Sequence, residues 1–177
     1  EFDSATIENS VQRILAAAEN QVREIIKEWR DGVYHGVATL DDDGRGNNDV
    51  KVRVAVTIKG SELTVDLTES DSQVDSFLNS SYANMRSAVA MAVAFMVDPE
   101  IAKNDGSMRP VKIKAKSGTI VYSKPGAPVT MSTSHCAQEI IEAIVVALSG
   151  ACPERTMAGW GRRLRIAIKG TSPKDGS

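Results

Sequence analysis

The sequence predicts an α+β fold, and three observations lead to this prediction. Apolar residues recur at steps of three or four in three segments, which is the spacing of helices that bury one face. In other segments apolar and polar residues alternate, which is the pattern of strands with one face exposed to solvent. The alternating segments are joined by short turns, so the pattern favours antiparallel β-hairpins packed with about three α-helices over a parallel βαβ array.

The composition fits one globular domain and excludes several classes of protein. The 177 residues are 42% apolar but only 5% aromatic, so we expect an aliphatic core. Lys and Arg number 21 against 23 Asp and Glu, a net charge of −2, which lacks the positive excess typical of nucleic-acid binding. The longest apolar run, residues 88–97, is about half of the roughly 18 residues that span a membrane. We therefore expect no nucleic-acid and no membrane partner.

Residues 1–31 predict a long amphipathic helix. Asp3, Ser4 or Thr6 can cap its start, and Asp31-Gly32 ends it. Its apolar stripe consists of Ile7, Val11, Ile14, Ala18, Val22, Ile25 and Trp29. Because this spacing is close to a heptad, the helix could pack on a partner chain as well as on its own domain, and core packing is the simpler interpretation.

Residues 32–170 predict the α+β body, and residues 171–177 a frayed tail. A short strand is expected at Val33–Thr39, and residues 50–68 predict a β-hairpin that turns at Lys59-Gly60-Ser61. The remaining expected elements are a buried helix at 82–97, a loop at 103–110, a strand at 111–115, an extended segment at 119–122, a helix at 134–149 capped by Thr133 or Ser134, and a last strand carrying Leu164, Ile166 and Ile168.

Metal and nucleotide motifs are incomplete. The two histidines and two cysteines lack the spacing of a zinc site, so no metal ligand is assigned. Residues 41–44 resemble a calcium loop, but Arg45 and Val52 would occupy ligand positions, so a turn is the better interpretation. Residues 159–161 lack the third glycine of a dinucleotide fingerprint, and no phosphate-binding loop is present. No cofactor is therefore expected within this chain.

Three residues are candidates for binding a substrate or an anion. Arg109 can hold an anion through its planar fork, in a loop that Asn104 helps to shape, or it can brace a carboxylate of Asp98, Glu100 or Asp105. His135 precedes Cys136 at a predicted helix start, where the helix dipole favours a thiolate. Neighbours on a helix point in different directions, so a structural role for this pair is the simpler interpretation, and no catalytic residue is assigned.

Several segments together resemble the hydantoinase B family, which includes the β subunits of ATP-dependent hydantoinases, the corresponding half of 5-oxoprolinase, and subunits of acetone and acetophenone carboxylases. Each motif is weak alone, and their order and spacing carry the resemblance. The motifs lie at 31–34, 40–44, 63–68, 73, 78–79, 104–110, 118–119, 125–128, 138, 147–148 and 153–155, and the run Asn104-Asp105-Gly106-Ser107-Met108-Arg109-Pro110 is the most specific.

The resemblance implies that residues 1–177 are one internal fragment of a larger B-type subunit. It further implies ATP-dependent hydrolysis of a cyclic amide, of the hydantoin or 5-oxoproline type, together with an A-type subunit in a hetero-oligomer. ATP and Mg²⁺ would then bind the A-type subunit, and any divalent metal would lie upstream of this fragment, which alone would be inactive.

Two alternatives stay open. The chain could belong to a carboxylase subunit that acts on a small ketone, or it could be a non-catalytic module for subunit interaction. Two cysteines are too few for a disulfide framework and no signal peptide is visible, so a cytoplasmic location is expected.

Overall fold

The computed structural model describes residues 2–157, 170 and 174, and it confirms the α+β class. The predicted strand at 164–168 and the motif at 159–161 lie outside the described residues, as does most of the predicted tail. The elements are α1 (Ser4–Glu28), β1 (Gly32–Asp42), β2 (Asn48–Lys59), β3 (Glu62–Asp66), α2 (Tyr82–Met96), α3 (Asp105–Met108), β4 (Val111–Lys114), α4 (Ala137–Leu148) and a 3₁₀ turn, η1 (Pro153–Arg155).

The four strands form one mixed sheet in the order β1-β2-β3-β4. β1 pairs antiparallel with β2, and β2 pairs antiparallel with β3, so the predicted hairpin at 50–68 is confirmed. β3 and β4 run parallel, with Leu63 opposite Val111, where only antiparallel pairing was expected. The reason is topological: α2 and α3 lie between these strands in the chain, and a crossover of this kind can return a strand in the same direction.

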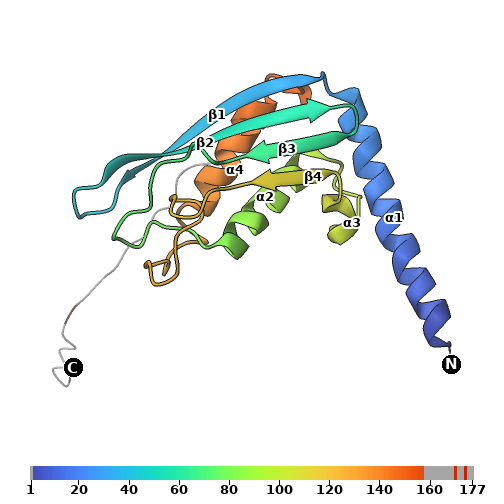
Figure 1. The fold of residues 1–177 in the computed structure, drawn as a ribbon, viewed down its shortest axis with the longest axis horizontal. Coiled ribbons are helices and arrows are strands. Elements are labelled where there is room, and N and C mark those ends of the chain that lie inside the picture. Colours follow the sequence, from blue (N-terminus) through green and yellow to red (C-terminus); the bar gives the residue numbers. More distant parts are fainter. Residues whose placement is uncertain (1, 158–169, 171–173, 175–177) are drawn as a thin grey trace.

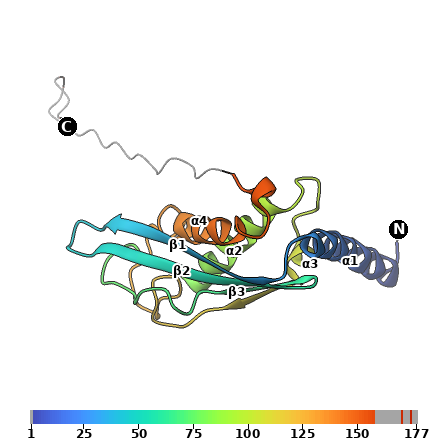
Figure 2. The same ribbon diagram turned by 90° about the horizontal axis from the view of Figure 1, so that it is seen from above.

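One face of the sheet is covered and the other is open. α2 and α4 lie on the same face (Figure 1, Figure 2). The side chains of β2 that point to this face are buried, whereas Lys51, Arg53 and Thr57 alternate with them on the other. The covered face carries the buried strand residues Ala38, Leu40, Val50, Val52, Val54, Val56, Ile58, Leu63 and Val65.

α4 lies directly on β1 because β1 carries a glycine at the point of contact. A Cβ on Gly36 would overlap the carbonyl oxygen of Ala143 in α4. The next inward residue of β1 is Ala38, and both Ala143 and Ala147 of α4 are buried. Small residues on both elements therefore allow the helix backbone to pack against the strand backbone.

α4 begins at Ala137, three residues after its predicted start, and neither Thr133 nor Ser134 caps it. The Ser134 hydroxyl instead donates to the carbonyl oxygen of Met131 at 3.3 Å, within a series of turns. Cys136 occupies the cap position with φ of 44° and makes no side-chain cap hydrogen bond. The predicted extended segment at 119–122 forms only two isolated bridges, Ser72 to Thr119 and Thr119 to Tyr122.

α1 is packed along only half of its length. The Asp3 carboxylate accepts from the Thr6 N–H at 2.7 Å, as predicted for the cap. Ala18, Val22, Ile25 and Ile26 in the second half are buried. The first half projects beyond the body (Figure 1), so the expected core packing holds for only one end of the helix. Within the part of the chain that the structure describes, no helix is both long and apolar enough to span a membrane.

A buried asparagine joins the loops at one end of the body. Asn79 is fully buried, and its side-chain oxygen accepts from the Val74 N–H at 2.8 Å. Its side-chain nitrogen points at the carbonyl oxygens of Val74, Ser76 and Pro128, at 2.8 to 3.0 Å. One amide therefore fixes the 74–79 loop to a segment about fifty residues later in the chain.

We expect Asn79→Asp to destabilise the fold by about 2–4 kcal/mol at pH 7, because the carboxylate oxygen that replaces the amide nitrogen would face three carbonyl oxygens. Burial raises the pKa of such a carboxyl, so the loss should shrink as the pH falls and the group becomes protonated. Urea unfolding at pH 7 and at pH about 5 measures both effects. Asn20→Asp, on the exposed surface of α1, is the matched control. Equal stability of the two variants at pH 7 would contradict this role of Asn79.

Candidate functional site

The loop that contains Asn104 and Arg109 is a short helical turn, α3, rather than the predicted open loop. The Asn104 side-chain oxygen accepts from the N–H groups of Gly106 at 2.9 Å and Ser107 at 3.3 Å, and so caps α3. The Ser107 hydroxyl donates back to the Asn104 carbonyl oxygen at 2.7 Å. Asn104 thus has a structural role that accounts for its presence in this motif.

Gly106 is the contact between α3 and α1. A Cβ there would overlap the carbonyl oxygen of Leu15 in α1. The glycine in the motif is therefore required by the close approach of two backbones, and the 104–110 loop holds the long helix in place.

Arg109 contacts a carboxylate that the sequence did not suggest. Its Nη1 atom lies 3.1 Å from Oε2 of Glu19 in α1, and not against Asp98, Glu100 or Asp105 as predicted for a structural role. Asp98 is bound instead by Arg155, at 2.7 Å. The partner was missed because Glu19 is ninety residues earlier in the chain. The one signal for Glu19 in the sequence is that it stands four residues before Arg23, which is the spacing of an ion pair on a helix.

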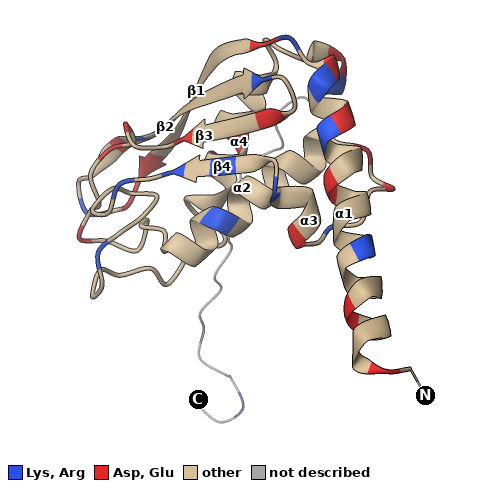
Figure 3. Ribbon diagram, turned by 45° about the vertical axis from the view of Figure 1, so that its right-hand side comes forward, with Lys and Arg blue, Asp and Glu red and all other residues tan. Residues whose placement is uncertain are grey.

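Five alternating charges form a chain from α3 across α1 to the sheet edge, which we call the charge chain: Arg109, Glu19, Arg23, Glu62 and Lys112. The acidic residues of β3 lie beside the lysines of β4 (Figure 3). Arg23 and Arg109 together lower the pKa of Glu19, and Lys112, with Arg23 second, lowers the pKa of Glu62. The side chains of Arg109, Glu62 and Lys112 are more than 40% exposed, and such ion pairs add little to the free energy of unfolding. The charge chain therefore orients α1 more than it stabilises the fold.

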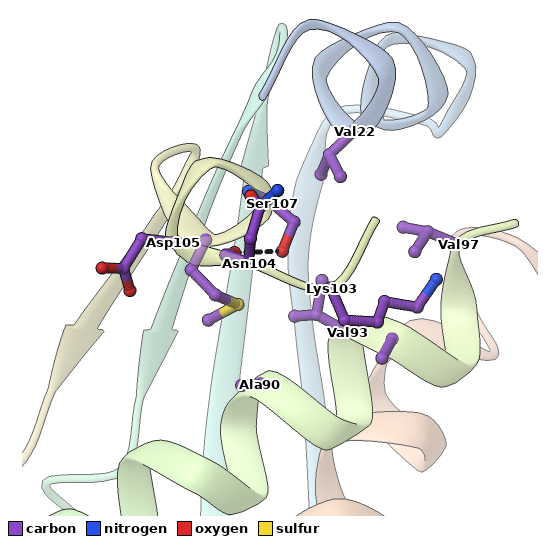
Figure 4. A pocket seen from close by; sticks show the side chains of 10 residues that line it. Val22, Ala90, Val93, Val97, Lys103, Asn104, Asp105 and Ser107 are labelled. Atoms are coloured by element: carbon purple, nitrogen blue, oxygen red, sulfur yellow. Dashed lines mark hydrogen bonds between the residues drawn. The ribbon is translucent and has the colours of Figure 1, made fainter. Parts of the chain in front are cut away.

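A hollow of about 280 Å³ lies between α1, α2 and α3 (Figure 4). Val22 of α1, Val93 of α2 and Val97, which directly follows α2, border it, together with Asn104 and Ser107. The Lys103 ammonium donates hydrogen bonds to the carbonyl oxygens of Asp98, Pro99 and Ile101, at 2.6 to 3.1 Å. The walls are therefore mostly apolar, and the side chains of Lys103, Asn104 and Ser107 are hydrogen-bonded within the loop.

His135 does not meet Asn104 and Arg109. It lies two residues before α4, whose first residues lie at the end of the body opposite to α3 (Figure 1, Figure 2). Its ring packs edge to face on Phe77, with centroids 5.2 Å apart, and its Nδ1 lies 3.4 Å from the Ser134 hydroxyl. The three predicted site residues therefore form no common site within this chain.

Both cysteines are buried and structural. The Cys136 thiol donates to the carbonyl oxygen of Ile120 at 3.4 Å, and the Cys152 thiol donates to that of Leu148 at the same distance. Burial, with the nearby charge of Glu154, raises the pKa of Cys152 to about 11, so this thiol stays protonated at neutral pH.

A turn joins β1 to β2, as predicted, but it lies at residues 43–47, because Asp41 and Asp42 still belong to β1. Asp43 is 5% exposed. The Ser76 hydroxyl, the Asn47 side chain and the N–H groups of Arg45 and Asn47 together hold the pKa of the Asp43 carboxyl well below its usual range. Among the residues that the structure describes, no group of three or more His, Cys, Asp or Glu side chains is placed to hold a metal ion.

Comparison with known proteins identifies the family. A family model described as Hydantoinase B/oxoprolinase matches residues 1–177. The chain is 32% identical to the β subunit of caprolactamase from Pseudomonas jessenii, over 89% of this chain and 27% of that protein. It is 28% identical to the B subunit of a putative D-/L-hydantoinase from Pseudomonas sp. (strain NS671), over 94% of this chain and 30% of that protein. The chain thus spans less than a third of these relatives, both of which are named as subunits.

Solved structures agree. The crystal structure of ATP-dependent caprolactamase from Pseudomonas jessenii matches with a TM-score of 0.79 and 29% identity, over 87% of this chain and 27% of that one. A nucleotide-free structure of acetone carboxylase matches with a TM-score of 0.68 and 16% identity, over 78% of this chain and 20% of that one, which shows a shared fold. Because the family model matches residues 1–177, the chain belongs to the hydantoinase B/oxoprolinase family.

Proposed function

We propose that this chain is part of the B-type subunit of an ATP-dependent hydrolase that opens a cyclic amide. The observation that carries the proposal is the family match over residues 1–177, together with the identity and fold shared with caprolactamase. The substrate would be a lactam, a hydantoin or 5-oxoproline. An unactivated amide is a poor electrophile, and transfer of phosphate from ATP to its oxygen would create a leaving group.

In this proposal ATP and Mg²⁺ bind an A-type partner subunit, and the two subunits form a hetero-oligomer. The described part of this chain supplies a scaffold. It consists of a sheet covered on one face, the projecting helix α1, and the segment 104–110, which contacts α1 near its middle. Both of its cysteines are buried and neither forms a disulfide in the described part of the chain, which supports the proposed cytoplasmic, reducing location.

The hydrolase is favoured over the carboxylase by sequence. Identity to the β subunit of caprolactamase is 32%, whereas the likeness to acetone carboxylase rests on the fold at 16% identity. The possibility of an interaction module without catalysis is tested by the same experiment, because such a module would support no turnover.

The full-length B-type subunit, mixed with its A-type partner and ATP, is expected to release phosphate only when a cyclic amide is present. Caprolactam, hydantoin and 5-oxoproline are each tested by phosphate release and by detection of the ring-opened product. Either subunit alone is the control. Turnover of a small ketone plus bicarbonate, without turnover of any cyclic amide, would replace the hydrolase with the carboxylase.

The 177-residue chain alone is expected to release no phosphate from ATP above the buffer rate, with or without a cyclic amide. The physical reason is that its predicted site residues are separated and held by contacts within the fold: Asn104 caps α3, Arg109 pairs with Glu19, and His135 packs on Phe77. Activity that follows the protein through successive columns would contradict this.

We expect Arg109 to act as a brace for α1 in the full complex. Arg109→Ala and Glu19→Gln should each lower the melting temperature, and the double variant should lower it by less than the sum of the two. The pKa of Glu19 is lowered on folding, so the coupling should be full above its ordinary value of 4.5 and fade as the pH falls below it. Thermal unfolding of the four proteins at pH 7 and pH about 3 measures this.

Turnover separates the brace from the anion-binding site that was predicted for Arg109. For a brace, Arg109→Lys leaves the turnover of the folded complex unchanged. For an anion site, the loss of the planar fork would reduce turnover about tenfold, or about 1.4 kcal/mol, at an unchanged melting temperature.

A further inference from the structure

We propose that the projecting half of α1 and the facing side of α2 receive an amphipathic helix from the remaining part of the same B-type subunit. The inference rests on the proposed function only in placing this chain within a longer subunit. It concerns how that subunit is assembled, and it does not depend on the reaction.

An apolar stripe on α1 is covered by the body in the second half of the helix and exposed in the first half. The stripe runs from Ile7 to Trp29 in steps of 4-3-4 and again 4-3-4, an 11-residue repeat that keeps it nearly straight on one face. Trp29 and Val22, at its end, are buried. Ile7, Val11 and Ile14 lie on the same face and are 54%, 46% and 59% exposed. A helix face that is buried at one end and exposed to solvent at the other indicates that another element covers the exposed end.

A groove runs along α2 from the hollow that Val22 borders. The hollow beside Val22 continues into a second one of about 290 Å³, and the two share Ala90, Asp105 and Met108. The α2 residues along this groove are mostly small. Ala83, Ser87, Ala90 and Ala94 follow one another in the same 4-3-4 steps. A row of small residues beside a row of large apolar ones accepts the ridge of a third helix.

The relatives of this chain are long enough to supply the covering helix themselves. This chain spans 27% to 30% of the caprolactamase and hydantoinase subunits it resembles, so most of such a subunit lies outside these residues. A segment of the same chain is present at high effective concentration. The charged residues along the groove are Arg86, Lys103 and Asp105, which are of mixed sign, and the Lys103 ammonium is held by backbone carbonyl oxygens of its own loop. The surface therefore selects an apolar face rather than a strongly charged partner.

The test compares alanine variants of the stripe in two contexts, the full-length subunit and the 177-residue chain. Val11→Ala and Ile14→Ala remove a β-branched residue from a helix, so on an exposed face they leave the melting temperature unchanged or slightly raised. Under a packed helix the same changes create a cavity. We expect both variants to reduce, by several degrees, the melting temperature of the full subunit and to leave that of the 177-residue chain unreduced.

Gln12→Ala is the matched control, because Gln12 is exposed and lies about 200° around the helix from Ile14. It should lower the melting temperature in neither context. Hydrogen exchange gives a second readout: the amides of residues 8–15 should be protected in the full subunit and not in the 177-residue chain.

Three results would overturn the proposal. Val11→Ala and Ile14→Ala could behave like Gln12→Ala in the full subunit. Protection of residues 8–15 could arise only when the A-type subunit is added. The 177-residue chain could form a dimer that Ile14→Ala weakens, which would make the occupant a second copy. None of these measurements uses ATP or substrate, so failure of the proposed hydrolysis would leave this result standing.

Discussion

The contact between α4 and the sheet at Gly36 is the constraint on which the rest of the body depends. Because Gly36 has no side chain, the backbone of α4 reaches the backbone of β1 at Ala143. The buried face of α4 then lies close enough to cover the valines of β2, and α2 packs on α4 in turn. A larger residue in β1 would separate these layers and leave apolar surface of both strands without cover.

α1 depends on a different set of contacts, all of them near its centre and end. Gly106 allows α3 to approach the Leu15 carbonyl, and the charge chain joins Glu19 and Arg23 to the strands. The motif at 104–110 therefore acts between two structural layers. Its specific residues are explained by a cap, a close approach and an ion pair, so the specificity of a motif is not by itself a sign of catalysis.

Features set by local periodicity could be predicted from the sequence. The β2-β3 hairpin follows from strict alternation about a Lys59-Gly60 turn, and the Asp3 cap follows from its side-chain oxygen. The parallel pairing of β4 could not be predicted, because four alternating residues carry no information on direction. The predicted start of α4 at residue 134 was wrong, because the Ser134 hydroxyl donates to a carbonyl oxygen within a turn and does not cap the helix. The predicted carboxylate partners of Arg109 were wrong, because they were chosen for being near in sequence, whereas Glu19 is near only in space.

The crossover between β3 and β4 has a consequence for the order in which the chain can fold. β1, β2 and β3 are joined by short turns, so their pairing closes small loops and is fast. β4 reaches β3 only after residues 67–110 have been brought back, with Leu63 N–H donating to the Pro110 carbonyl oxygen at 2.9 Å. Until then the open edge of β3 presents unpaired N–H and C=O groups to other chains. A nascent chain emerging from the ribosome would carry that exposed edge until α2, α3 and β4 had been synthesised.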